Sequence, residues 1–206
     1  MAIKGLVFDF DGTLTRPGSI DFAGIKRALA CPPEKAILEF LDTLDPDRLP
    51  QALETVEKFE MEAAEKSSPN DGVADLLNWI LRRGLPWGIL TRNGRPSLNV
   101  ALTKFSPSVR DQAAFILTRD DVAPKPNPAG VLAAARLLQV SSTEIMVVGD
   151  YRFDILAGQK ADAVTVLLTH GRPPPMRPED QPPDYTVATL ADLRVLLDNL
   201  LSGRTG

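Results

Sequence analysis

An apolar run near the N-terminus reads Leu6-Val7-Phe8-Asp9-Phe10-Asp11-Gly12-Thr13-Leu14, with two aspartates at its end. A short apolar run that a turn residue stops is typical of a buried parallel strand, and Gly12 is that stop. In open α/β sheets, ligands bind beyond the carboxyl ends of the strands, and side chains two residues apart point the same way. The run therefore predicts a strand that carries Asp9 and Asp11 to a candidate site. Taken alone, the pair fits loop capping equally well, so the rest of the chain must decide.

The composition is that of an ordinary globular chain. Its 206 residues, 44% hydrophobic and 24% charged, fit one domain with room for a modest insertion. A net charge of -4 and a pI near 5.1 argue against nucleic acid or an anionic membrane as the main partner, because either needs a basic face. The expected partner is a small soluble ligand, bound by a monomer or a homodimer.

The compartment follows from the cysteine and from the apolar runs. Cys31 is the single cysteine, which excludes an internal disulfide framework and suits a reducing cytosol. The sequence has no apolar run of about eighteen residues and no export signal, so we expect a cytoplasmic protein without a membrane anchor.

After Leu14 the sequence keeps a helical pattern, without a strand-like run, until about residue 69. The pattern predicts helices over residues 21–30, over residues 34–44 and from Pro50 onward. We expect a core of residues 1–14 and 70–206 and a small α-helical cap of residues 15–69. The insertion directly follows the candidate site, which favours a lid; the alternative is an extra helical layer of the core. The apolar stripe of the third helix is expected at Leu53, Val56, Phe59 or Glu60, and Ala63.

From Val73 onward, helical and strand-like patterns alternate. Such alternation requires a parallel sheet that is covered on both faces. We therefore predict an α/β fold, a doubly wound, Rossmann-like parallel sheet with the helical cap inserted after its first strand. Residues 172–183 are proline-rich and are expected to form a surface connection without regular structure. The expected strands are residues 86–91, 114–117, 145–148 and 164–168, and the expected helices are residues 73–84, 96–105, 128–138, 153–160 and 190–201.

Polar residues also follow the later strands, in an order that resembles a known family. They are Thr91, Lys125 in Pro124-Lys125-Pro126, and Gly149-Asp150 with Asp154. The pattern resembles the haloacid dehalogenase-like superfamily of phosphohydrolases, whose members carry Asp-x-Asp-x-Thr, then Ser or Thr, then Lys, then Gly-Asp with a further Asp. The resemblance covers residues 3–171 and is nearest to phosphoglycolate-phosphatase-like members. Four motifs in register are a far stronger signal than any one of them.

The charges in this cluster call for a cation. Four carboxylates, Asp9, Asp11, Asp150 and Asp154, face only Lys125, and a substrate phosphate adds further negative charge. Oxygen ligands beside a phosphate suit Mg²⁺. We expect the side chains of Asp9 and Asp150 as ligands, and the resemblance implies the backbone carbonyl of Asp11 as another. Asp154 would orient the ligands, directly or through water.

The resemblance also implies the roles of the remaining residues. Asp9 would attack phosphorus and form an aspartyl-phosphate, and Asp11 would serve as the general acid and base. Thr91 and Lys125 would bind the phosphoryl oxygens, with Arg92 beside them.

Three further residues stay open at this stage. Arg16 and Arg95 would contact a second anionic group of the substrate or lie on the solvated surface, as Arg92 also could. His170 is expected to be a loop residue.

The predicted activity is that of a Mg²⁺-dependent phosphatase that hydrolyses a small phosphorylated metabolite. One alternative is a phosphomutase of the same superfamily, which returns the phosphoryl group to a sugar. A second is a receiver-like module that accepts a phosphoryl group without turnover. The helical insertion after the first strand argues against the receiver-like module.

Overall fold

The computed structural model describes residues 2–203, except for the side chains of residues 108 and 109. Its centre is a parallel sheet of six strands in the order β3-β2-β1-β4-β5-β6. This is the strand order of doubly wound α/β folds and confirms the predicted fold class. The strands are β1 (Gly5–Phe8), β2 (Trp87–Leu90), β3 (Phe115–Leu117), β4 (Ile145–Gly149), β5 (Val164–Leu168) and β6 (Tyr185–Val187).

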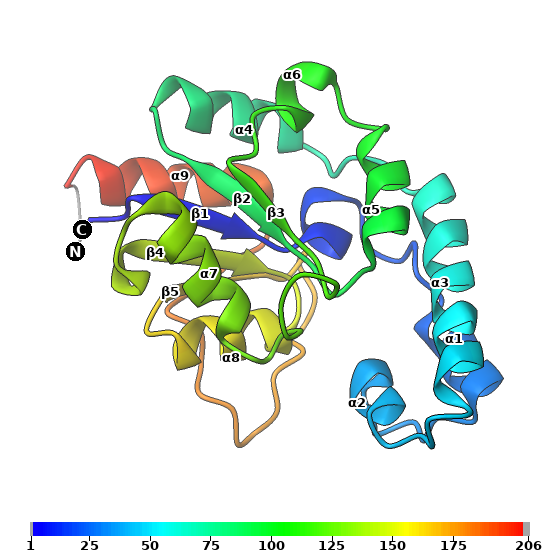
Figure 1. The fold of residues 1–206 in the computed structure, drawn as a ribbon. Helices are drawn as coiled ribbons and strands as arrows, with labels where there is room; N and C mark the ends of the chain where they lie inside the picture. Colours follow the sequence, from blue (N-terminus) through cyan, green and yellow to red (C-terminus); the bar gives the residue numbers. More distant parts are fainter. Residues whose placement is uncertain (1, 204–206) are drawn as a thin grey trace.

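Helices cover both faces of the sheet (Figure 1). The helices α4 (Val73–Arg82), α5 (Arg95–Leu102) and α9 (Leu190–Leu201) pack on one face. The helices α7 (Ala129–Leu138) and α8 (Arg152–Lys160) pack on the other. The strands β1 and β4 are fully buried between these layers, which explains why their sequences are continuous apolar runs.

The strand order reverses between β1 and β4, which are hydrogen-bonded neighbours. The chain leaves β1 toward β2 and β3 on one side, whereas β5 and β6 lie beyond β4 on the other. Their carboxyl ends therefore open side by side at the place where doubly wound sheets bind ligands. After β1 the chain makes a tight turn, η1 (Phe10–Leu14), in which Gly12 has a φ of 77°.

Residues 15–69 leave the sheet beside this turn and form three helices with a hydrophobic cluster of their own (Figure 1). The helices are α1 (Phe22–Leu29), α2 (Ile37–Leu41) and α3 (Leu49–Lys66). The two ends of the segment meet in an antiparallel bridge between Thr15 and Pro69. The confirmed fold class thus includes the helical insertion after the first strand.

The main differences between the observed and the expected elements are five. The helix α2 is shorter than residues 34–44, because residues 33–35 form a turn and Ala36 is extended. The fully buried stripe of α3 holds Ala52, Val56, Glu60, Ala63 and Ala64, whereas Leu53 is only partly buried against the cluster of residues 15–69. The short helix α6 (Pro107–Arg110), the 3-10 turn η2 (Ser142–Glu144) and the strand β6 were not predicted.

One other expectation holds: residues 172–183 contain no helix or strand. Within residues 2–203, no helix has the length and the apolar character that crossing a membrane would need.

Candidate active site

The turn after β1 places Asp9 and Asp11 at the carboxyl edge of the sheet. The backbone amide of Asp9 donates to the carbonyl of Val148 at 2.8 Å, so Asp9 continues the pairing of β1 with β4. A Cβ atom on Gly12 would lie 2.1 Å from Oδ2 of Asp150. A glycine is therefore required here twice, for its positive φ and for the close approach of that carboxylate.

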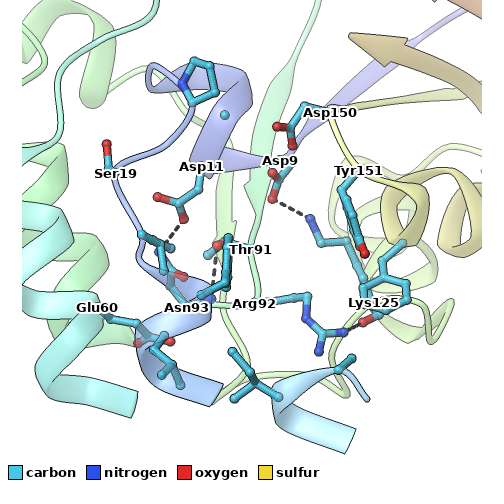
Figure 2. A pocket seen from close by; sticks show the side chains of 18 of the residues that line it. Asp9, Asp11, Ser19, Glu60, Thr91, Arg92, Asn93, Lys125, Asp150 and Tyr151 are labelled. Atoms are coloured by element: carbon cyan, nitrogen blue, oxygen red, sulfur yellow. Dashed lines mark hydrogen bonds and ion pairs between the residues drawn. The ribbon is translucent and has the colours of Figure 1, made fainter. Parts of the chain in front are cut away.

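Asp150 and Asp154 come from the end of β4 and the first turn of α8. Oδ2 of Asp154 accepts the backbone amide of Tyr151 at 3.1 Å and so caps α8. One carboxylate oxygen from each of Asp9, Asp150 and Asp154 lies within 4.8 Å of the others. The structure therefore brings these three predicted residues together, and Figure 2 shows Asp150 beside Asp9.

Lys125 is the cation of this cluster. Its side chain is 3% exposed, and Nζ donates to Oδ1 of Asp9 at 2.6 Å, to Oδ1 of Asp154 at 2.5 Å and to the carbonyl of Leu90 at 2.7 Å. All three ammonium donors are therefore used. The lysine therefore holds the carboxylate of Asp9 in one orientation.

Burial and mutual repulsion raise the pKa values of the carboxyl groups. Burial raises the pKa of Asp9 to about 6, against the lowering effect of Lys125. Burial and the charge of Asp9 raise the pKa of Asp11 to about 7. Burial and the charges of Asp9 and Asp154 raise the pKa of Asp150 to about 8. Burial opposes the charged form of Lys125, but Asp154 and Asp9 outweigh it and raise the pKa of the lysine. The site holds more negative charge than one lysine balances.

The loop after β2 carries Thr91 and a residue that the sequence analysis overlooked. Oγ1 of Thr91, a buried residue, accepts the backbone amide of Asn93 at 3.1 Å. Nδ2 of Asn93 donates to Oδ2 of Asp11 at 2.5 Å (Figure 2). Asn93 thus fixes the carboxyl group of Asp11. Its place two residues after the strand-end threonine was the only sequence signal for it.

Glu60 is the second overlooked residue. It lies on α3, is 6% exposed, and forms an ion pair with Arg119 from the loop after β3. Its Oε2 accepts the backbone amide of Gly94 at 3.2 Å and the hydroxyl of Ser97 at 3.3 Å. A charged residue in an apolar helical stripe was its sequence signal.

The arginines named in the sequence analysis all pair with acids in the structure. Arg92 forms a two-point ion pair with Glu39 of α2, with N to O distances of 2.9 and 2.7 Å. It also donates to the carbonyl of Lys125. Arg16 pairs with Asp71 and Arg95 with Asp121.

His170, the other residue left open, lies at the edge of the same turn. Its Nε2 is 2.6 Å from the carbonyl oxygen of Gly12. The histidine therefore follows β5 as a loop residue, in contact with the backbone of η1.

A cavity of about 340 Å³ lies between the sheet edge and residues 15–69. Asp9, Asp11, Lys125, Asp150 and Asp154 lie on its sheet side, together with Thr91 and Arg92. Its other wall comes from α1, α2 and α3 and from the segment before α1. Cavities of this size hold small molecules.

The donor set fits Mg²⁺. It consists of oxygen atoms and it is compact, and burial together with the repulsion between carboxylates raises the pKa values of Asp9, Asp11 and Asp150. Both oxygens of Asp154 already accept hydrogen bonds, one from Lys125 and one from Tyr151. Asp154 is therefore better suited to orient its neighbours than to bind the ion.

Comparison with known proteins agrees with this geometry. Residues 3–162 match the family model of haloacid dehalogenase-like hydrolases. The chain is 27% identical to N-acetylmuramic acid 6-phosphate phosphatase of Pseudomonas aeruginosa, over 97% of this chain and 96% of the relative. It is 28% identical to phosphoglycolate phosphatase of Pectobacterium atrosepticum, over 95% of this chain and 93% of the relative.

Among solved structures, a hydrolase from Pseudomonas syringae has the same fold, with a TM-score of 0.78 at 24% identity over 96% of this chain and 98% of that one. The expected class of enzyme, a phosphoric monoester hydrolase, is confirmed by the family match and these phosphatase relatives. The chain belongs to the haloacid dehalogenase-like hydrolase family.

Proposed function

We propose that the protein is a Mg²⁺-dependent phosphatase that hydrolyses a small phosphorylated metabolite through an aspartyl-phosphate on Asp9. The observation that carries the proposal is the position of Asp9. Its carboxylate lies at the end of β1 on the cavity, 2.6 Å from the ammonium of Lys125 and beside Asp150. A fixed, cation-paired carboxylate of this kind is suited to nucleophilic attack.

Asp9 and Asp150 would bind Mg²⁺ through their side chains, and Asp11 through its backbone carbonyl. The ion would balance the negative charge of the carboxylates and of the phosphate that enters among them. Lys125 adds one positive charge at fixed distance from Asp9, and Thr91 offers its buried hydroxyl to a phosphoryl oxygen. We propose Arg92 for a phosphoryl oxygen as well, although this requires that it release Glu39.

The reaction then has two steps. A carboxylate oxygen of Asp9 forms a bond to phosphorus as the bond to the ester oxygen breaks, and Asp11 donates a proton to the departing alcohol. Asp11 next removes a proton from water, whose oxygen attacks phosphorus as the bond to Asp9 breaks and phosphate leaves. The pKa of Asp11, about 7, suits a group that gives and takes a proton near neutral pH.

Residues 15–69 would act as a cap. They supply one wall of the cavity, opposite the catalytic carboxylates, so they contact the leaving group of any ester bound there. The relatives act, by name, on phosphoglycolate and on N-acetylmuramic acid 6-phosphate, which supports a small phosphorylated substrate. The cytoplasmic location and the monomeric or homodimeric state stay predictions.

A phosphate-release screen over a few dozen phosphorylated metabolites tests the proposal. Turnover is expected with Mg²⁺ and not with a chelator, and acid quenching during turnover should leave phosphate bound to the protein. The Asp9→Asn variant is the control and should show neither. Chelator-resistant hydrolysis would remove the metal from the mechanism, and a long-lived phosphoprotein without turnover would support the receiver-like alternative instead.

A further inference from the structure

The wall of the cavity that faces the catalytic carboxylates is apolar. Its apolar side chains come from the start of the helical segment and from all three of its helices. They are Pro17, Ile20, Phe22, Ile25, Ala36, Ile37, Leu38 and Val56. Phe22 is 58% exposed although it is a large apolar residue, and so is available to cover a ligand. A leaving group with an apolar body would cover this wall and remove its apolar surface from water, which favours binding. A small polar alcohol would leave the same surface exposed to water.

Arg92 is placed to bind a second anionic group of the substrate, but Glu39 balances its positive charge. The guanidinium of Arg92 lies 4.7 Å from the ring centre of Phe153 and is held at both ends of its fork by the carboxylate of Glu39. The side chain of Arg92 is 21% exposed and that of Glu39 is 42% exposed, so water screens this two-point pair in part. An anion that approached Arg92 would meet the negative charge of Glu39 as well, and juxtaposed like charges disfavour binding.

Besides Arg92 and the buried Lys125, two more cations line the cavity. Arg16 pairs with Asp71 at 2.5 Å. Lys26 donates to the carbonyl of Pro33 at 2.5 Å, and within residues 2–203 no acid lies in ion-pair distance of it. The side chains of Arg16 and Asp71 are 58% and 84% exposed, so this pair is weak and does not withdraw Arg16. Lys26 and Arg16 are therefore the residues that would have to bind a second anionic group, if the substrate had one.

We propose that the substrate is a phosphate monoester whose alcohol has an apolar, uncharged body. Glu39 is then a specificity-determining residue, because it withdraws Arg92 from the recognition of a second anion. This inference rests on the proposed phosphatase activity and narrows its substrate class. Specificity of this kind uses an attractive apolar wall and a repulsive charge together.

A matched pair of substrates separates the effect of the repulsive charge from that of the apolar wall. Benzyl phosphate and its 4-carboxy derivative have the same ring and differ by one charge. Wild-type enzyme with Mg²⁺ should prefer benzyl phosphate in kcat/KM by about tenfold or more, since a repulsive contact of about 1.4 kcal/mol is a factor of ten. The Glu39→Gln variant should recover most of this loss for the carboxylated ester through KM, so that the ratio of kcat/KM between the two esters falls toward one. Any effect of the freed Arg92 on the phosphoryl group is common to both esters and cancels in this ratio.

Two further variants complete the test. Glu54→Gln removes the same charge from an exposed position of α3 and should change neither ester. Phe22→Ala should raise the KM of benzyl phosphate several-fold relative to methyl phosphate, because only the benzyl ester covers the apolar wall.

The outcomes are distinct. A wild-type preference for the carboxylated ester that Lys26→Met abolishes would overturn the inference and leave the proposed phosphatase activity standing. A Glu39→Gln variant that treats both esters as wild type does would also overturn it. Turnover of no phosphate ester, with Mg²⁺ present, would overturn the phosphatase activity and the inference together.

Discussion

Replacing Lys125 by methionine tests how the site is held together. Methionine keeps an unbranched side chain of similar length and removes the charge. In the variant, Asp9 and Asp154 lose the ammonium that lies 2.6 and 2.5 Å from them, and the carbonyl of Leu90 loses its donor. The side chain of Asp154 is 3% exposed, so water cannot take the place of the lysine there.

The size of the expected loss in the free energy of unfolding follows from how deeply the ion pair is buried. Removing one partner of a buried ion pair typically costs about 3–5 kcal/mol, because the other charge stays buried without compensation. The chain supplies a matched control in the ion pair of Lys4 with Glu144. It has the same N to O distance, 2.6 Å, but side-chain exposures of 55% and 25%. Exposed pairs contribute about 0–1 kcal/mol, so Lys4→Met should cost little.

The assay is urea denaturation of both variants in chelator, from pH 5 to pH 8. The pKa of Asp9 in the folded protein is about 6, above its ordinary value of 3.8, so its stabilising effect is present at low pH and is lost as the pH rises through 6. Without Lys125 that pKa rises further, and the deficit of Lys125→Met should grow with pH. A deficit below about 1 kcal/mol at pH 8, or one equal to that of Lys4→Met, would refute this reasoning.

Three other predictions concern the chemistry. Asp9→Asn should abolish turnover, because an amide cannot form the acyl-phosphate, and should keep the urea midpoint near that of the wild type. Full activity of this variant would refute the mechanism. Asp11→Asn should lower kcat by roughly 10²–10⁴ for an unactivated alkyl ester, and an unchanged kcat would assign Asp11 to structure. The affinity for Mg²⁺, measured by calorimetry, should rise from pH 6 to pH 8, because Asp9 and Asp150, with pKa values of about 6 and about 8, lose their protons over this range. An affinity for Mg²⁺ that does not change with pH would exclude these two residues as ligands. Ca²⁺ should bind at the same site and suppress turnover.

The sequence predicted the elements whose pattern is local. The strand β1 is a continuous apolar run that ends at Gly12, and α9 has the predicted bounds because four leucines recur at helical spacing. The strand β6 has three residues and a sequence too short to show a period. It exists because its backbone pairs with β5, and such long-range pairing leaves no mark in the sequence.

In the candidate site, too, some residues could be predicted from local sequence patterns and others could not. Asp9, Lys125 and Asp150 could be placed together because each follows or precedes a recognisable strand or helix. The role of Asn93 depends on where the loop after β2 meets Asp11, a residue 82 positions earlier. The partner of Glu60 depends on how α3 packs against the loop after β3. Such contacts are set by tertiary packing, which single-sequence patterns do not record.

Glu39 and Glu60 both reach from the helical segment to the loop after β2, and their contacts have different consequences. Glu60 binds the amide of Gly94, next to Asn93, which in turn holds Asp11. Losing Glu60 leaves Arg119, whose side chain is 9% exposed, without its acid and loosens the loop that positions the acid–base residue. Every ester should then be hydrolysed more slowly, whatever its alcohol. Losing Glu39 frees a guanidinium beside the leaving group and should separate esters by their charge. We therefore expect residues 15–69 to contribute to the chemistry through one carboxylate and to specificity through the other, and we expect an exchange of the whole segment for that of a relative to change both at once.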